Sequence, residues 1–105
     1  MKSISIALLA TAGLLASGVT QAADETALAT SKGCMACHNV DKKVVGPSYK
    51  DVAKKYTAKD ADKLVTKVLE GGTGTWGQVP MPANKTMGLT EPDAKKLVAW
   101  ILTLK

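Results

Sequence analysis

The chain has few of the side chains from which a small protein usually builds its core and its reactive sites. Its 105 residues include no phenylalanine, two tryptophans, two tyrosines, two cysteines and one histidine, and each of the 14 Lys or Arg positions is lysine. A domain of this size buries little apolar surface and usually needs an additional stabilising element. A zinc site of the usual four-ligand kind would need a second cluster of Cys or His, which the sequence lacks. These absences predict an interior filled by something other than the chain's own side chains.

Both cysteines and the histidine fall in one stretch, Cys34-Met35-Ala36-Cys37-His38. The pattern Cys-x-x-Cys-His is the attachment signature of c-type haem. A tight turn brings the two thiols to the two vinyl groups of the porphyrin, where they form thioethers, and the next residue offers its imidazole to the iron. The sequence therefore predicts one covalently bound haem c, attached through Cys34 and Cys37, with His38 as an axial ligand. Because the porphyrin would fill the interior, we expect the apo-protein to be largely unfolded.

Two other uses of cysteines at this spacing fit the sequence less well. A redox-active dithiol of the thioredoxin type belongs to a βαβ setting, and the chain shows no strand pattern. A structural disulfide across so short a loop would stabilise the fold little. Covalent haem attachment is therefore the favoured reading of the motif.

Residues 1–22 have the pattern of a secretory signal peptide. Lys2 is followed by an apolar run over 4–15 and then by small and polar residues up to Ala22, where we place the cleavage. A membrane anchor would need about 20 apolar residues, and Ser, Thr and Gly interrupt this run. We therefore predict a cleaved signal peptide at 1–22 and a monohaem domain at 23–105, located in the periplasm and without a membrane span.

Helical patterns dominate the mature part and predict an all-α fold of four short helices and an ordered loop around the haem. Ser48 and Thr90 each begin a capping-box pattern with an acidic residue three positions later, and Asp60 is expected to cap the third helix. Loops as long as the Gly- and Pro-rich segment Gly71 to Leu89 are usually functional or disordered, and this one is expected to be ordered. The predicted helices run from Thr26 to about Lys32, from Tyr49 to Tyr56, from Ala61 to Glu70, and from the Thr90 cap to about Leu104.

The iron needs a second axial ligand, and methionine is the candidate because no other histidine exists. Met81 lies between Pro80 and Pro82, which stiffen the backbone and reduce the entropy that the thioether loses on binding. Met87 is the alternative, although its place beside the last helix favours a packing role. His38 and Met81 together would saturate the iron and raise its reduction potential. A closed iron of this kind suits an electron carrier.

Four segments of the chain together form a pattern known from one protein family: Gly33 to His38, Val45 to Tyr49, Gly74 to Gly77, and Val79 to Pro82. They resemble the small class I cytochromes c of bacterial respiratory chains, most closely the short periplasmic donors to nitrite reductase or terminal oxidases. The resemblance implies helices packed round one haem with an exposed edge. It also implies that the Pro47 carbonyl accepts a hydrogen bond from His38 Nδ1. By the same resemblance, Trp76 would hydrogen-bond a haem propionate and Asn84 would approach the Met81 sulfur.

The charge of the mature chain bears on its partners. Without residues 1–22 the chain keeps 13 of its 14 lysines against 9 acidic residues, a polypeptide charge of +4. The lysines between positions 42 and 67 form either a solvated surface or a ring that steers the haem edge to acidic patches on redox partners. Nucleic acid is not expected as a partner. We expect a monomer that accepts electrons from a donor such as a membrane cytochrome complex and delivers them to nitrite reductase or a terminal oxidase.

Two functions of different class remain open on the sequence. The favoured one is a soluble periplasmic electron carrier that cycles between Fe(III) and Fe(II) and is not an enzyme. The alternative is a haem enzyme, or a sensor of gas or peroxide, in which Met81 is labile. The prolines beside Met81 argue against lability, and the chain has neither an arginine nor a second histidine to activate peroxide.

Overall fold

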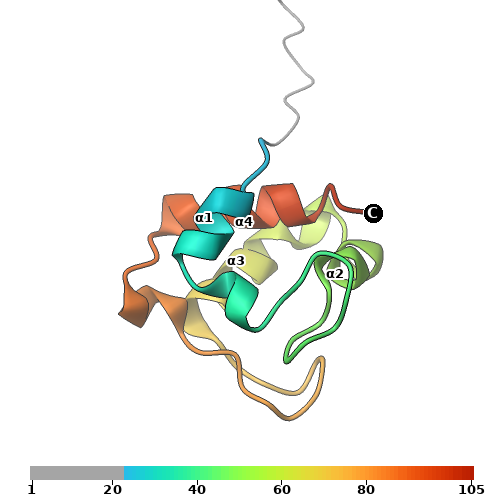
Figure 1. The fold of residues 1–105 in the computed structure, drawn as a ribbon. Helices are drawn as coiled ribbons and strands as arrows, with labels where there is room; N and C mark the ends of the chain where they lie inside the picture. The colour runs from blue at the N-terminus through green and yellow to red at the C-terminus, as the bar shows by residue number, and fades with distance from the viewer. Residues whose placement is uncertain (1–22) are drawn as a thin grey trace, which may run out of the picture.

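The computed structural model describes residues 23–105, so the predicted signal peptide at 1–22 lies outside the described residues. The described part is helical and has no strand, apart from an isolated antiparallel bridge between Gly72 and Met81 (Figure 1). The α-helices are α1 (Thr26–Ser31), α2 (Tyr49–Lys55), α3 (Ala61–Glu70) and α4 (Glu91–Ile101), and 3₁₀ helices cover Cys34–Ala36, Ala58–Asp60 and Asn84–Met87. The prediction of four short helices is confirmed, although α4 ends at Ile101 rather than near Leu104.

Two of the three predicted helix caps are present. The Ser48 hydroxyl accepts the Asp51 N–H at 3.1 Å, and the Thr90 hydroxyl accepts the Asp93 N–H at 3.2 Å. The expectation that the Asp60 side chain caps α3 is wrong. Its carboxylate accepts the N–H of Thr57 at 2.9 Å instead and closes a capping box on the preceding 3₁₀ helix. The chain therefore has one more helical turn before α3 than the sequence pattern indicated.

The core forms where α4 meets the other helices. Helix α4 packs against α1, α2 and α3, and α1 crosses it in Figure 1. Ala29 of α1 and Ala94 of α4 are fully buried, which lets the helix backbones approach closely. Leu97, at 2% exposure, is the largest fully buried side chain, and burying such a residue contributes about 1.5–3 kcal/mol. This small helical core supports the segments that build the site.

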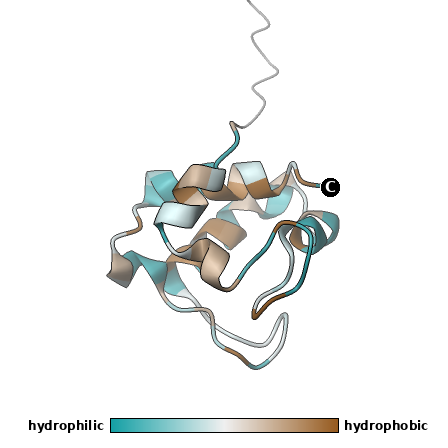
Figure 2. Cartoon of the chain, in the orientation of Figure 1, coloured by the Kyte–Doolittle hydropathy of each residue, from teal (hydrophilic) through white to brown (hydrophobic). Residues whose placement is uncertain are grey.

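Two loops leave the helical body on the same side of the molecule (Figure 1). The first, residues 39–48, joins the 3₁₀ helix Cys34–Ala36 to α2, and the second, residues 71–83, follows α3. Figure 2 shows hydrophobic residues near the tip of the first loop, where Val44 and Val45 are exposed. Within residues 23–105, none of the helices has the length and apolar character needed to cross a bilayer.

Candidate haem-binding site

A cavity of about 500 Å³ lies among the attachment motif, the two loops and the inner sides of α3 and α4. Its volume falls within the range of about 300–1,000 Å³ found for ligand and cofactor pockets. Seven residues that the sequence singled out, far apart along the chain, meet at its wall: Cys34, Cys37, His38, Pro47, Trp76, Met81 and Asn84. The fold thus brings the whole predicted residue set to one place.

The attachment motif forms a tight turn. Gly33 adopts φ 78°, a left-handed conformation that glycine tolerates, and ends the first helical segment. The 3₁₀ helix Cys34–Ala36 follows, and the N–H groups of Cys37 and His38 both donate to the Cys34 carbonyl, at 3.3 Å and 3.0 Å. Both thiols are free and half-buried, and they line the cavity together with the His38 imidazole. The turn therefore presents two sulfurs and one nitrogen to the same space.

The surroundings of Cys34 do not activate it as a nucleophile. Burial raises the pKa of the Cys34 thiol, and hydrogen bonding with Tyr49 only partly opposes this effect. Redox-active Cys-x-x-Cys motifs instead lower the pKa of their exposed thiol. Burial likewise raises the pKa of the Tyr49 hydroxyl, with Cys34 adding to the shift. The Cys34 thiol thus lacks the lowered pKa that is typical of the reactive thiol in a thioredoxin-type dithiol.

The His38 imidazole is closely held by the loop 39–48. Its Nδ1 lies 2.8 Å from the Pro47 carbonyl oxygen, the contact that the family resemblance implies, and this leaves Nε2 available as a ligand atom. A Cβ on Gly46 would lie 2.8 Å from His38 Nδ1, so only glycine fits against this side of the ring. The base of the loop is tied to the attachment motif because the N–H groups of Val45 and Gly46 both donate to the Cys37 carbonyl, at 3.2 Å and 2.7 Å.

Met81 lies near the end of the second loop, and its backbone is fixed by pairing with Gly72 near the start of the same loop. Its N–H donates to the Gly72 carbonyl at 2.9 Å, and the Gly72 N–H donates to the Met81 carbonyl at 3.1 Å. The neighbouring Gly71 has φ 73° and ψ −163°, and a Cβ there would lie 2.8 Å from the Pro82 carbonyl carbon. The Met81 side chain is half-buried, whereas Met87 is 59% exposed, although both border the cavity.

Asn84 and Trp76 connect the second loop to different helices, α3 and α2. Asn84 is buried, and its side-chain amide donates to the carbonyls of Val68 at 3.0 Å and Pro82 at 3.3 Å, which ties the loop to α3. Trp76 is 39% exposed, and the Lys55 ammonium lies 5.0 Å from the centre of its ring. The contacts of Asn84 with the Met81 sulfur and of Trp76 with a propionate stay predictions.

Several residues that shape the site were not assigned a site role from the sequence. The sequence identifies Tyr49 as the start of a predicted helix and the end of a segment that carries the family resemblance, but not as a contact of His38. Its ring stacks on the His38 imidazole with the centroids 5.0 Å apart. The sequence does not show which residues Gly46 and Gly71 contact, and it does not distinguish Lys55 from the other lysines. A glycine directly before the Pro47 position and a glycine pair at the end of a helix are the available signals. Neither signal identifies the partner that approaches.

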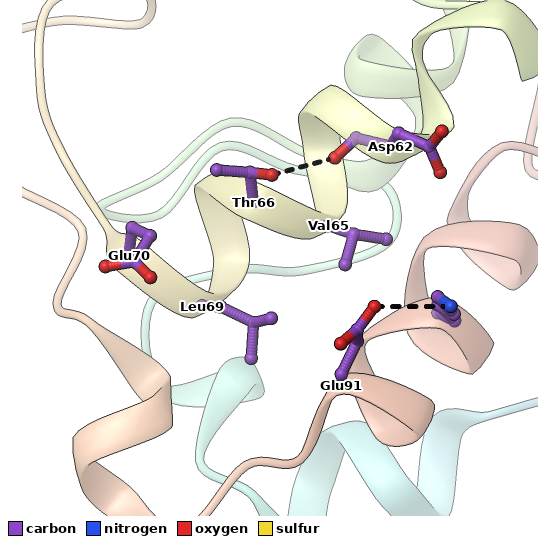
Figure 3. A pocket seen from close by; sticks show the side chains of 7 residues that line it. Asp62, Val65, Thr66, Leu69, Glu70 and Glu91 are labelled. Carbon is purple, nitrogen blue, oxygen red and sulfur yellow. Dashed lines mark hydrogen bonds and ion pairs between the residues drawn. The ribbon is translucent and has the colours of Figure 1, made fainter.

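A second hollow, of about 450 Å³, lies between α3 and the start of α4 (Figure 3). Val65 and Leu69 contribute its apolar side chains, and Asp62, Glu70 and Glu91 its carboxylates. Glu91 pairs with Lys95 at 3.3 Å, and Glu70 pairs with Lys85 at 2.7 Å. No group of three potential metal-binding side chains occurs among residues 23–105. The lining of this hollow includes no cysteine, histidine or methionine, whereas that of the first cavity includes all three residue types.

The geometry of the first cavity agrees with the comparisons to known proteins. The family model for cytochrome c matches residues 23–105. The chain belongs to the cytochrome c family. It is 46% identical over 107 residues to cytochrome c-552 of Nitrosomonas europaea, with both chains fully covered. It is 52% identical over 90 residues to cytochrome c2 of Rhodocyclus tenuis, covering 79% of this chain and 95% of that protein. The crystal structure of Nitrosomonas europaea cytochrome c552 matches with a TM-score of 0.70 and 51% identity, over 75% of this chain and 98% of that one.

These relatives confirm the predicted class of small bacterial class I cytochromes c and the all-α fold. A cytochrome c carries one covalently bound haem c and transfers electrons, so the protein is an electron carrier and not an enzyme. Its residues fit the cofactor. Cys34 and Cys37 have the attachment spacing, and the hydrogen bond to Pro47 uses Nδ1 of His38 and leaves Nε2 for the iron. The cavity that these residues border has a cofactor's size.

Proposed function

We propose that this cytochrome is a periplasmic electron carrier whose iron is bound by His38 on one side and Met81 on the other. The bound haem c supplies the one-electron Fe(III)/Fe(II) couple. Cys34 and Cys37 hold the cofactor through thioether bonds. The observation that carries the proposal is that these four residues line one cavity, and that the chain has no second histidine. A saturated iron undergoes little rearrangement when it gains or loses an electron.

The residues next to the two ligands support this assignment. The Pro47 carbonyl accepts the Nδ1 proton of His38, which fixes the tautomer and increases the electron donation of the imidazole. On the other side, the paired hydrogen bonds between Gly72 and Met81 fix the backbone from which the thioether projects. Met87 ends the 3₁₀ helix Asn84–Met87 and is largely exposed, so it is the weaker candidate.

The surface around the cavity fits redox partners with acidic patches. Lys43, Lys63 and Lys67 border the cavity, whereas Asp62 and Glu70 lie beside the second hollow, on another side of α3. The exposed Val44 and Val45 add apolar surface near the same loop. An uneven charge distribution of this kind orients the cavity side toward an acidic partner and makes association depend on salt. We propose a membrane cytochrome complex as donor and nitrite reductase or a terminal oxidase as acceptor.

The proposal includes export by cleavage of residues 1–22 and function as a monomer. Haem attachment would then follow outside the cytoplasm. Mass spectrometry of the periplasmic protein checks the cleavage and the haem attachment, because the mature chain would begin at Ala23 and carry the mass of one haem.

The test of the axial ligands is the optical spectrum of the oxidised and the dithionite-reduced holoprotein, with carbon monoxide added to the reduced form. We expect sharp reduced α and β bands, a weak near-infrared band from sulfur to Fe(III), and no response to carbon monoxide. In Met81→Ala the near-infrared band should disappear and carbon monoxide should bind. Met87→Ala is the matched control and should behave like the unaltered protein.

Three outcomes would contradict this assignment in different ways. Carbon monoxide binding in the unaltered protein would favour the alternative of an enzyme or sensor with a labile methionine. Loss of the near-infrared band in Met87→Ala alone would move the axial role to Met87. A colourless periplasmic protein would show that no haem is attached and would favour a redox-active dithiol of Cys34 and Cys37.

A further inference from the structure

We propose that Tyr49 is the positioning residue that fixes the rotational orientation of the His38 imidazole beneath the haem. The inference rests on His38 being an axial ligand, as proposed above, and goes beyond it in assigning what sets the angle of the ring. The plane of an axial imidazole determines which iron d orbitals it interacts with. An imidazole held at one angle therefore gives the iron one electronic structure.

The hydrogen bond to Pro47 restrains one atom of the ring but does not by itself define the ring plane. The torsion that turns a histidine ring about its Cβ–Cγ bond is broad and has no sharp intrinsic minima. A single hydrogen bond of 2.8 Å at Nδ1 permits the ring to pivot about that contact. A further contact on the face of the ring is needed to select one plane.

Tyr49 supplies that contact. Its ring lies nearly parallel to the imidazole, with an interplanar angle of 25° and the centroids 5.0 Å apart. Rotating the imidazole out of this plane would push its ring atoms against the phenol or break the stacking. Gly46 lies next to the same imidazole, because a Cβ added there would come within 2.8 Å of Nδ1 and 3.0 Å of Nε2, and its backbone restricts movement on that side. His38 is therefore restrained by three residues of one short segment, of which only Tyr49 has an aromatic face.

Tyr49 is itself held firmly enough to act as a reference surface. It is 4% exposed, and its backbone N–H donates at 2.9 Å to the carbonyl of Asn39, the residue that follows His38. The indole of Trp100 in α4 meets its ring edge-on, at 5.7 Å and 80°. Trp100 is also buried, at 5% exposure. Trp100 of α4 therefore supports the Tyr49 ring at the start of α2, and the Tyr49 ring in turn supports the His38 imidazole.

The test uses the proton NMR spectrum of the oxidised holoprotein with cyanide bound to the iron. Cyanide replaces the methionine and is symmetric about its bond to iron, so the spread and order of the four haem-methyl shifts report the His38 plane alone. We expect Tyr49→Phe, which keeps the stacked ring, to retain the pattern of the unaltered protein. Tyr49→Leu, which removes the ring, should reorder the methyl shifts or reduce their spread.

A control separates positioning from general loosening of the core. Leu97 is buried in α4 and does not border the cavity, so Leu97→Ala should lower the thermal midpoint and leave the methyl pattern unchanged. The proposal is overturned if Tyr49→Leu retains the pattern, if Tyr49→Phe alters it as much as Tyr49→Leu, or if Leu97→Ala reproduces the change.

A measurement on the unaltered protein keeps the proposal testable if Tyr49→Leu does not mature. A single ring orientation predicts one sharp set of haem-methyl resonances at all temperatures. A second set of resonances, or exchange broadening, indicates averaging between orientations and would overturn the proposal. Failure of the underlying assignment looks different, because a protein without His38 ligation would lack strongly shifted His38 ring protons in its unaltered form.

Discussion

The two segments that carry the proposed axial ligands are held in different ways. His38 lies between a helical turn and a loop whose base is fastened to the attachment motif by backbone hydrogen bonds, and its ring is packed against Gly46 and Tyr49. Met81 follows an exposed loop in which Gly72, Gly74 and Gly77 all have positive φ. One backbone bridge, between Gly72 and Met81, closes this loop on itself. Two side-chain contacts attach it to the helices: the Asn84 amide donates to the Val68 carbonyl of α3, and the Lys55 ammonium of α2 lies over Trp76.

This difference indicates where the structure can yield. A ligand enclosed by buried contacts stays in place unless the fold opens, whereas a ligand on a lightly attached loop can leave by local opening at lower free energy. Displacement of an axial ligand should therefore begin at Met81 and not at His38. Three variants that alter contacts of the second loop test this comparison, from the largest expected effect to the smallest.

The largest effect is expected for Gly71→Ala. At φ 73° and ψ −163° the position suits only glycine, and a Cβ would also meet the backbone of Pro82 and Ala83. The conformational strain and the overlap together should destabilise the holoprotein by about 2–5 kcal/mol, measured by guanidinium unfolding. Gly74→Ala is the control, because φ is 104° there but the added Cβ meets open space. It should lose about 1–2 kcal/mol, and equal losses for the two variants would show that the packing at Gly71 is unimportant.

An intermediate effect is expected for Asn84→Ala. Removing the buried amide leaves the Val68 carbonyl without its partner, which costs about 1–3 kcal/mol. Because this contact ties the loop to α3, carbon monoxide should bind the reduced variant faster than the unaltered protein while the haem stays attached. Thr86→Ala serves as the control, since the Thr86 hydroxyl donates to the nearby Ala83 carbonyl at 2.7 Å and not to α3. Unchanged carbon monoxide binding in Asn84→Ala would mean that the α3 contact does not restrain Met81.

The smallest effect is expected for Lys55→Gln. The Lys55 ammonium lies over Trp76 at an exposed site, where a cation–π contact contributes about 0.5–1 kcal/mol. Its loss should increase amide hydrogen exchange in residues 73–80 and leave the loop 39–48 unchanged. Lys55→Arg keeps the cation and should restore protection. Equal hydrogen exchange in Lys55→Gln and Lys55→Arg would show that the positive charge of Lys55 does not help to hold the loop.

The agreement between sequence and structure is best where local chemistry decides. The spacing of Cys34, Cys37 and His38 specifies the attachment turn, and the caps at Ser48 and Thr90 act on backbone N–H groups three residues away. Asp60 marks the limit of such reasoning, because a competing partner, the N–H of Thr57, was equally close along the chain. Local patterns predict that a side chain will cap, but not always which helical turn it caps.

The sequence by itself determined the haem motif, the four helices and the candidate ligands, because each depends on residues within a few positions of one another. Only the tertiary structure decided that Tyr49 lies against His38, that Trp100 of α4 supports Tyr49, and that Asn84 reaches the Val68 carbonyl. These contacts join residues 11, 51 and 16 positions apart. Packing of whole helices sets such distances, and no pattern in a short window of sequence contains that information.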